Sequence, residues 1–165
     1  MNWIAGLGPA RLATMPRPRG GDWLKEEIEQ LRVEGVDVLV SALTPDEVDE
    51  LGLVQEPDTC RENGISFLAF PIADRDVPDS YGAVRSFVEG LNKELCDSKA
   101  VAIHCRAGIG RSSLLAACTL VVAGLSVDQA FAAIREARGC NVPDTEVQRV
   151  WVEKFAQRVQ GARVE

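Results

Sequence analysis

Residues 101–113 read Val101-Ala102-Ile103-His104-Cys105-Arg106-Ala107-Gly108-Ile109-Gly110-Arg111-Ser112-Ser113. The stretch predicts a buried strand that ends at a cysteine, a five-residue loop with two glycines, and a helix that begins at about Ser112. The helix continues to about Ala123 with hardly a polar residue. Because such a helix has no face to offer to water, we expect it to lie at the centre of the fold.

The loop in this stretch has the composition of an anion-binding site. Glycines let successive backbone N–H groups point inward, and the N-terminus of the next helix adds a partial positive charge. Arg111 can grip two anionic oxygens at once, which a lysine cannot reproduce. We therefore expect phosphate to be bound by Arg106, Ala107, Gly108, Ile109, Gly110 and Arg111.

Cys105 lies at the base of this predicted phosphate cradle. The positive field of the loop favours its thiolate form, which makes Cys105 a candidate nucleophile toward phosphorus. The alternative is a buried structural thiol beside a tight turn. That alternative accounts for a lone cysteine, but it does not explain why a cysteine, two glycines and an arginine meet at one strand-to-helix junction.

On both sides of this stretch, helix and strand patterns alternate. Helices are predicted at residues 22–35 after an Asp22 cap, from residue 45 behind a Thr44–Glu47 capping box, and at residues 81–96, 126–139 and 145–160. Strands are predicted at residues 36–40, 65–72 and 100–104, and loops at 15–21 and 74–79. The pattern predicts a single α/β domain over residues 1–165, with a central, mostly parallel sheet flanked by helices. Residues 1–21 are expected to be irregular, and residues 22–160 to form the core.

Composition excludes several classes of function. The chain has 165 residues, 46% of them hydrophobic, and its 18 Lys and Arg against 25 Asp and Glu give a net charge of −7. This length suits one domain with a sizeable core. The acidic balance argues against a nucleic-acid partner, and a single histidine excludes a multi-histidine zinc site.

Location is predicted from the cysteines and the apolar segments. Five cysteines, an odd number with no CxxC pair, favour reduced thiols in the cytoplasm over a disulfide framework. The longest apolar run, residues 114–125, is shorter than the ~20 residues that span a bilayer. Residues 1–10 lack the basic start of a secretory signal. We therefore expect a cytoplasmic protein, monomeric and without a membrane partner.

The motif HCxxGxxRS at residues 104–112 resembles the phosphate loop of the cysteine-dependent protein tyrosine and dual-specificity phosphatases. The chain's small size is similar to that of the dual-specificity group. The segment PIADRDVPD at residues 71–79 resembles the acid loop of the kinase-associated phosphatase branch and its microbial relatives. The order of elements agrees from about Arg11 to Arg158. The resemblance implies hydrolysis of phosphate monoesters through a cysteinyl-phosphate intermediate, without a metal or other cofactor.

The resemblance also assigns roles to residues. It implies that Cys105 attacks phosphorus, that Arg111 and the loop N–H groups hold the phosphate oxygens, and that Asp74 serves as the general acid. Ser112 matches the hydroxyl that eases departure of the thiolate, and His104 matches the histidine that supports the loop backbone. Two further carboxylates on the acid loop compete for the role of the acid, Asp76 and Asp79.

A second similarity lies near the C-terminus. Residues 144–148 resemble the Gln-Thr-x-x-Gln segment that positions water in the large tyrosine phosphatases, but Asp144 replaces the first glutamine. A capping box already explains Thr145 and Gln148, so we interpret this pair as a helix cap. Arg17 and Arg19 are interpreted as an exposed basic loop rather than as ligands of a second anionic group.

The implied substrate is a phosphorylated protein or a small phosphate ester. Our first hypothesis is a phosphatase for phosphotyrosine, with or without phosphoserine and phosphothreonine. The second is a phosphatase for a phosphoinositide, a nucleotide or an RNA 5′ end. Phosphoinositide enzymes of this superfamily often carry two lysines in the loop, and here the two positions hold Arg106 and Ile109, which weakens that hypothesis. A phosphate-binding protein without activity is a third alternative, although such proteins typically lose the Cys or the Arg.

Overall fold

The fold is organised around a five-stranded sheet in the order β1-β2-β5-β3-β4, in a computed structural model that describes residues 1–161. The strands are β1 (Asn2–Trp3), β2 (Arg11–Pro16), β3 (Val38–Ser41), β4 (Ser66–Ala69) and β5 (Ala100–Cys105). Strands β2, β5, β3 and β4 run parallel, and β1 pairs antiparallel with β2. Parallel strands bring their carboxyl ends to one edge of the sheet, which is where α/β proteins bind ligands.

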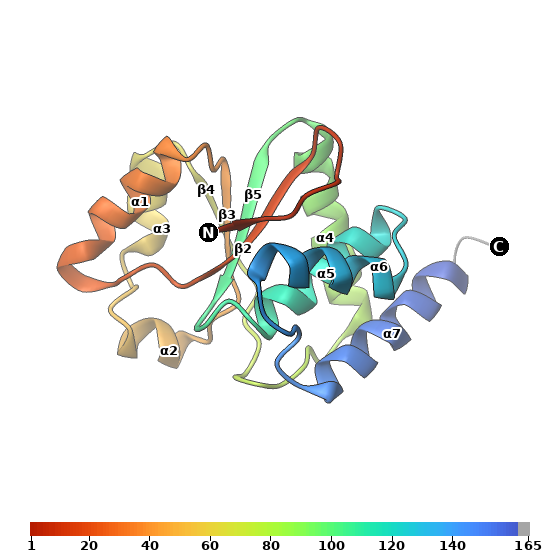
Figure 1. The fold of residues 1–165 in the computed structure, drawn as a ribbon. Coiled ribbons are helices and arrows are strands. Elements are labelled where there is room, and N and C mark those ends of the chain that lie inside the picture. The colour runs from red at the N-terminus through yellow and green to blue at the C-terminus, as the bar shows by residue number, and fades with distance from the viewer. Residues whose placement is uncertain (162–165) are drawn as a thin grey trace.

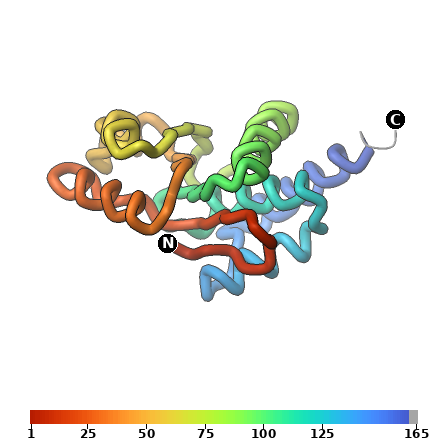
Figure 2. Tube along the Cα trace, turned by 90° about the horizontal axis from the view of Figure 1, so that it is seen from above, coloured from red at the N-terminus to blue at the C-terminus, as the bar shows by residue number. Residues whose placement is uncertain are grey.

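Helices cover both faces of the sheet, as expected from the alternating pattern (Figures 1 and 2). One face carries the 3₁₀ turn Gly21–Trp23 and three helices, α1 (Leu24–Val33), α2 (Pro45–Glu50) and α3 (Glu56–Glu62). The other face carries α4 (Tyr81–Cys96), α5 (Arg111–Val122), α6 (Val127–Arg138) and α7 (Glu146–Gly161). Each face has its own apolar cluster. The predicted α/β class with a mostly parallel sheet is confirmed.

Helix α5 is the centre of the larger layer. It packs against α4, α6, α7 and β5, and its residues from Arg111 to Val121 are all buried. This confirms the expectation drawn from its almost wholly apolar sequence. The same burial fixes the phosphate loop, because that loop joins the carboxyl end of β5 to the N-terminus of α5.

Capping residues placed several helix ends correctly. Ser126 and Gln129 form a capping box at the start of α6, and Gly139 ends that helix in the left-handed conformation, with φ of 72°. Thr145 and Gln148 bond each other's backbone N–H groups at the start of α7, and α4 has the predicted bounds. The strands β3 and β4 are four residues each. β4 is shorter than the predicted residues 65–72 because its parallel ladder with β3 covers only Ser66–Ala69.

Three expectations were wrong. Residues 1–21 are not irregular: they supply β1 and β2, and β2 lies inside the sheet between β1 and β5. The partner of β2 lies about 90 residues further along the chain, a pairing that local patterns cannot reveal. Asp22 does not cap α1, because a 3₁₀ turn precedes the helix and Trp23 occupies the cap position. Helix α3 was not predicted at all. Residues 162–165, included in the predicted domain, lie outside the described residues.

Candidate active site

The phosphate loop is compact because glycine occupies its two tightest positions. Gly108 has a φ of +70°, and a Cβ there would lie 2.5 Å from the carbonyl carbon of Met15. A Cβ on Gly110 would lie 2.9 Å from Cβ of Asp144 and 2.9 Å from Oε1 of Gln148. Any side chain at either position would therefore force neighbouring groups apart. Cys105, at the end of β5, is buried at the base of this loop.

Backbone carbonyls of the loop are bonded from outside it. Arg138, at the end of α6, donates from Nε to the Gly108 carbonyl at 3.1 Å and from Nη2 to the Ala107 carbonyl at 3.1 Å. The backbone N–H of Arg17 donates to the Arg106 carbonyl. Because the carbonyls point toward these donors, the loop can present N–H groups to an anion on its other side.

Arg111 is the most heavily bonded side chain of the site and is only 2% exposed. Its Nη1 lies 2.6 Å from Oε2 of Glu47, and its Nη2 lies 2.9 Å from Oε1 of the same carboxylate. Nη1 also donates to the Ile72 carbonyl at 2.9 Å. This two-pronged pairing orients the guanidinium plane and satisfies the charge of a buried arginine.

Glu47 therefore supports the site, although the sequence assigned it only a helix cap. Its carboxylate still accepts a hydrogen bond from the backbone N–H of Thr44 at 3.0 Å, as the predicted capping box requires. Burial acts to raise its pKa, but hydrogen bonds from Arg111 and Thr44 outweigh burial and hold the pKa of Glu47 at about 2. The same contacts raise the pKa of Arg111 above its ordinary value, against the effect of burial.

The structure separates the three candidate acids. Asp74 reaches Arg111, with Oδ1 3.0 Å from Nη2. Asp76 turns to its own loop, where its carboxylate accepts from the Val77 N–H at 2.8 Å. Asp79 lines a hollow of about 250 Å³ beside the acid loop, away from the phosphate loop. Of the three, Asp74 is the carboxylate that shares a pocket with Arg111.

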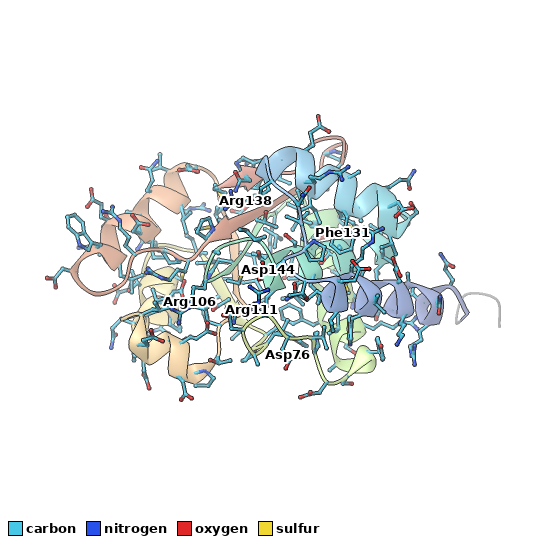
Figure 3. The ribbon with its side chains drawn as sticks, turned by 60° about the horizontal axis from the view of Figure 1, so that its bottom comes forward. Asp76, Arg106, Arg111, Phe131, Arg138 and Asp144 are labelled. Atoms are coloured by element: carbon cyan, nitrogen blue, oxygen red, sulfur yellow. The ribbon has the colours of Figure 1, made fainter. Side chains whose placement is uncertain are left out.

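That pocket has a volume of about 160 Å³. Figure 3 views the molecule from this end and labels three residues that line the pocket, Arg106, Arg111 and Asp144, together with Asp76 of the neighbouring acid loop. Its walls are Asp74 and Arg75 from the acid loop, Asp144 and Gln148 from the start of α7, and the loop residues Arg106, Ala107, Ile109, Gly110 and Arg111. The phosphate-binding residues predicted from sequence, Gly108 apart, line this one pocket together with the predicted acid.

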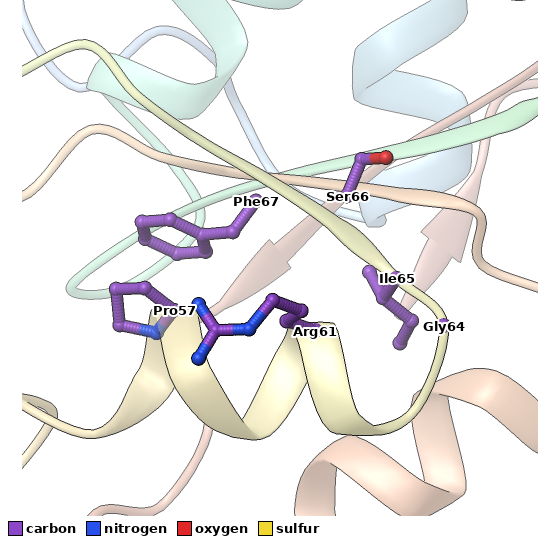
Figure 4. A pocket seen from close by; sticks show the side chains of 6 residues that line it. All are labelled: Pro57, Arg61, Gly64, Ile65, Ser66 and Phe67. Atoms are coloured by element: carbon purple, nitrogen blue, oxygen red, sulfur yellow. The ribbon is translucent and has the colours of Figure 1, made fainter.

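A larger hollow, of about 560 Å³, lies elsewhere on the surface, between α3 and β4 (Figure 4). Its walls are Pro57, Arg61, Gly64, Ile65, Ser66 and Phe67. They offer no thiol or carboxylate, so chemistry of the kind predicted from sequence belongs to the smaller pocket. Within residues 1–161 no three His, Cys, Asp or Glu side chains cluster closely enough to hold a metal ion.

Ser112 and His104 lie on different sides of Cys105, the candidate nucleophile. The Oγ of Ser112 lies 3.3 Å from Sγ of Cys105, both buried. His104 points to the opposite face of the sheet, where its Nε2 lies 2.9 Å from Oε1 of the buried Glu56. This pair is a close contact rather than an aligned hydrogen bond, and neither ring nitrogen bonds the phosphate loop. The structure thus gives His104 a carboxylate neighbour instead of the loop backbone that the resemblance implied.

Four residues of the site were missed or underrated. Glu47 and Arg138 reach the site from α2 and α6, and Glu56 of α3 contacts His104 behind it. They are distant in sequence, and the one local motif among them, the capping box of Glu47, indicates a helix start and not a role at the site. Gln148 is both a helix cap and a fully buried wall of the pocket. For Gln148 a signal existed, since the similarity at residues 144–148 indicated a second role beside the cap.

Comparison with known proteins agrees with this geometry. Residues 13–125 match a family described as "Polymorphic toxin system, DSP-PTPase phosphatase". Cyclin-dependent kinase inhibitor 3 of Rattus norvegicus is 28% identical over 138 residues, which cover 82% of this chain and 65% of that protein. Protein tyrosine phosphatase domain-containing protein 1 of Bos taurus is 33% identical over 139 residues, 79% of this chain and 17% of that protein. The chain thus spans less than two thirds of either relative.

Solved structures share the fold. A crystal structure of kinase associated phosphatase has a TM-score of 0.83 at 24% identity and covers 96% of this chain and 94% of its own. The crystal structure of PTPMT1 in complex with PI(5)P has a TM-score of 0.73 at 18% identity, and the match covers 94% of this chain and 93% of that chain.

In the described part of this chain, no helix is both long and apolar enough to cross a membrane. Since the phosphatase family matches more than half of its residues, the chain belongs to the dual-specificity and protein tyrosine phosphatases.

Proposed function

We propose that this chain hydrolyses phosphate monoesters on phosphotyrosine-containing proteins through a cysteinyl-phosphate intermediate, without a metal. The observation that carries the proposal is the arrangement of three groups around one pocket. Asp74 and Arg111 line this pocket 3.0 Å apart, with Arg111 held in a fixed plane by Glu47. The buried Cys105 directly precedes the loop that forms the pocket wall. Nucleophile, phosphate binder and acid are the three functions that the reaction needs.

In the first step, Sγ of Cys105 attacks phosphorus as the bond from phosphorus to the ester oxygen breaks. Asp74 gives its proton to the departing oxygen, which leaves as an alcohol or phenol. Arg111 and the loop N–H groups bind the three remaining oxygens as charge develops on them. The protein then carries phosphate on Cys105.

In the second step, a water molecule attacks the phosphocysteine, and Asp74 takes up the proton that the water loses. The bond from sulfur to phosphorus breaks, inorganic phosphate leaves, and the thiolate returns. The Ser112 hydroxyl, whose Oγ lies 3.3 Å from Sγ, donates a hydrogen bond to the sulfur as negative charge returns to it. Both steps balance without an oxidant, a reductant or a metal ion.

A second candidate substrate is a non-protein phosphate such as a phosphoinositide. Two observations favour it. The pocket walls carry no aromatic side chain that could stack on a phosphotyrosine ring, and they include the exposed side chains of Arg75 and Arg106, to which a second phosphate could bind. A structural neighbour, PTPMT1, has been crystallised with PI(5)P. Both candidates use the same reaction and differ only in what surrounds the phosphate.

The test is a substrate panel with purified protein: p-nitrophenyl phosphate, phosphotyrosine and phosphothreonine peptides, phosphoinositides and nucleotides. We expect the highest kcat/KM on phosphotyrosine peptides, and no measurable turnover of any substrate by a Cys105→Ser variant. A kcat/KM at least tenfold higher on a phosphoinositide would replace phosphotyrosine with the second candidate. Absence of turnover on every substrate would contradict both.

A further inference from the structure

We propose that the start of α7 acts as a clasp that holds the acid loop over the pocket, with Gln148 and Asp144 as positioning residues for Asp74. This inference rests on the proposed function, since it concerns the proposed acid. Two contacts form the clasp. Gln148 donates from Nε2 to the backbone carbonyl of Asp76 at 3.1 Å, and Asp144 lies 3.7 Å from the Arg75 guanidinium.

The acid loop is packed into the core at its two ends, but its middle has little packing of its own. A hollow of about 250 Å³ lies beside the loop, lined by the loop's own residues and by the start of α4. Asp74, Arg75 and Asp76 are all exposed. Arg75 adopts a φ of 60°, a left-handed conformation that is unfavourable for a residue with a side chain. A segment with exposed side chains, a hollow beside it and one strained residue gains order from the groups of other segments that bond it.

Gln148 has the geometry of such a group. Its side chain is fully buried, its Oε1 accepts from the Thr145 N–H at 3.2 Å, and its Nε2 is thereby aimed at the Asp76 carbonyl. A cap alone would use only the oxygen of the amide. The nitrogen reaches across to a residue 72 positions earlier, two residues beyond the proposed acid.

Asp144 adds an electrostatic contact on the same side. The Gln-Thr-x-x-Gln segment of the large tyrosine phosphatases has a glutamine at this position, so this chain has a carboxylate where that segment has an amide. The only cation within ion-pair distance of Asp144 in the described chain is Arg75 of the acid loop. The pair is exposed, which limits its energy, but it connects the same two segments as Gln148 does.

Both segments also meet the phosphate loop. Gly110 lies so close to Asp144 and Gln148 that a Cβ on it would come within 2.9 Å of each side chain. Asp74 in turn bonds Arg111. The start of α7 thus contacts the phosphate loop on one side and the acid loop on the other. This position lets it set the distance between the nucleophile and the acid.

The experiment compares kcat/KM for phenyl phosphate and p-nitrophenyl phosphate. Phenol is a poor leaving group and needs the acid, whereas p-nitrophenol leaves with little protonation. Gln148→Met removes one neutral hydrogen bond, so we expect kcat/KM for phenyl phosphate to fall roughly 3- to 10-fold, while the value for p-nitrophenyl phosphate changes less than about twofold. Asp144→Asn should lower the phenyl phosphate value by about twofold, as expected for an exposed ion pair.

Controls separate the clasp from general damage. Asn92→Leu removes an amide that bonds the carbonyls of Val88 and Thr119 far from the pocket, and should change both substrates equally. Gln148→Glu keeps the oxygen that caps α7 but loses the donor, so it should repeat the selective loss even if Gln148→Met is poorly folded. Arg75→Asn removes the other partner of the ion pair and places at this position a residue that tolerates left-handed φ. Because both variants break the same pair, the loss of kcat/KM for phenyl phosphate in Arg75→Asn should not add to that in Asp144→Asn.

Gln148 could instead position the attacking water. In that case Gln148→Met would slow only the second step: kcat would fall equally for both substrates, kcat/KM would not change, and phosphoenzyme would accumulate. That result would overturn the clasp. So would unchanged hydrogen exchange at the Asp76 N–H, which donates to the Ala73 carbonyl at 3.0 Å and should exchange faster in Gln148→Met. Failure of wild-type protein to hydrolyse either ester would instead refute the proposed function, and the exchange measurement would still test the clasp.

Discussion

The phosphate loop and the acid loop meet in one pocket but are built differently. The phosphate loop joins a buried strand to a buried helix, and Arg138 and the Arg17 backbone bond its carbonyls. The middle of the acid loop, residues 73–76, is exposed, lies beside a hollow, and is bonded by side chains from elsewhere, notably Arg111 and Gln148. The core thus fixes the half of the site that we propose binds phosphate, while a few side-chain contacts hold the half that we propose moves the proton.

This difference predicts two kinds of mutational effect. Damage to the phosphate loop should lower activity on every substrate, because all of them present the same phosphate. Damage to the acid loop should depend on the leaving group. The predictions below test that division, from the largest expected effect to the smallest.

Replacing the nucleophile should have the largest effect. Cys105→Ser puts a neutral alcohol where a thiolate is expected, so kcat should fall by roughly four orders of magnitude or more on all substrates. Binding of phosphate esters should remain, because Arg111 and the loop N–H groups are unchanged. Steady-state rates and binding of a phosphotyrosine peptide by calorimetry would check both statements. Activity near that of the wild type would remove Cys105 from the reaction.

Replacing the phosphate-binding arginine should come next. Arg111→Lys keeps the charge but loses the planar fork that pairs with Glu47 and with phosphate oxygens. We expect kcat/KM to fall roughly 10²- to 10³-fold, to the same extent for p-nitrophenyl and phenyl phosphate. A loss confined to phenyl phosphate would mean that Arg111 acts mainly through Asp74, and would break the proposed division between the two loops.

Replacing the acid should give a selective loss. Asp74→Asn should lower kcat/KM about 10²-fold on phenyl phosphate, much less on p-nitrophenyl phosphate, and should flatten the basic limb of the pH profile. Asp76→Asn is the matched control, because its carboxylate bonds the Val77 N–H and not Arg111. If Asp76→Asn showed the leaving-group dependence instead, the acid would be Asp76.

The smallest effect on rate, but a measurable one on stability, is expected at Glu47. Because the pKa of Glu47 is about 2 in the folded chain against an ordinary 4.5, the folded state binds fewer protons than the unfolded state between these pH values. Its stabilisation, on the order of 3 kcal/mol, is therefore complete above pH 4.5 and is lost as pH falls toward 2.

Urea unfolding of the wild type and of Glu47→Gln from pH 7 to pH 2 tests this prediction. The free energies of unfolding should differ most at pH 7 and converge as the pH approaches 2. A difference that stayed constant over this range would mean that the ionised pair with Arg111 does not contribute. Because Glu47 also orients Arg111, the variant should lose activity evenly across substrates, as the phosphate loop predicts.

The sequence indicated much of the fold where local patterns are strong. The bounds of α4 follow from its amphipathic period, and the ends of α6 and the start of α7 follow from capping residues. It missed β2 because that strand is stabilised by β5, whose residues lie about 90 positions away. Helix α3 was missed because it is seven residues long, too short to show a period.

What the sequence by itself determined is which residues the proposed phosphate loop brings together. Residues 104–112 are contiguous, so a strand, two glycines and a helix N-terminus suffice to bring Cys105, Arg111 and Ser112 together. Only the tertiary structure shows which carboxylate of the acid loop contacts Arg111 and which groups bond that loop. Asp74, Glu47, Arg138 and Gln148 come from four separate segments, and their contacts exist only after the sheet and helices have packed. Short-range interactions along the chain are enough to form a site whose residues are contiguous, whereas contacts between distant segments depend on the packing of the whole domain.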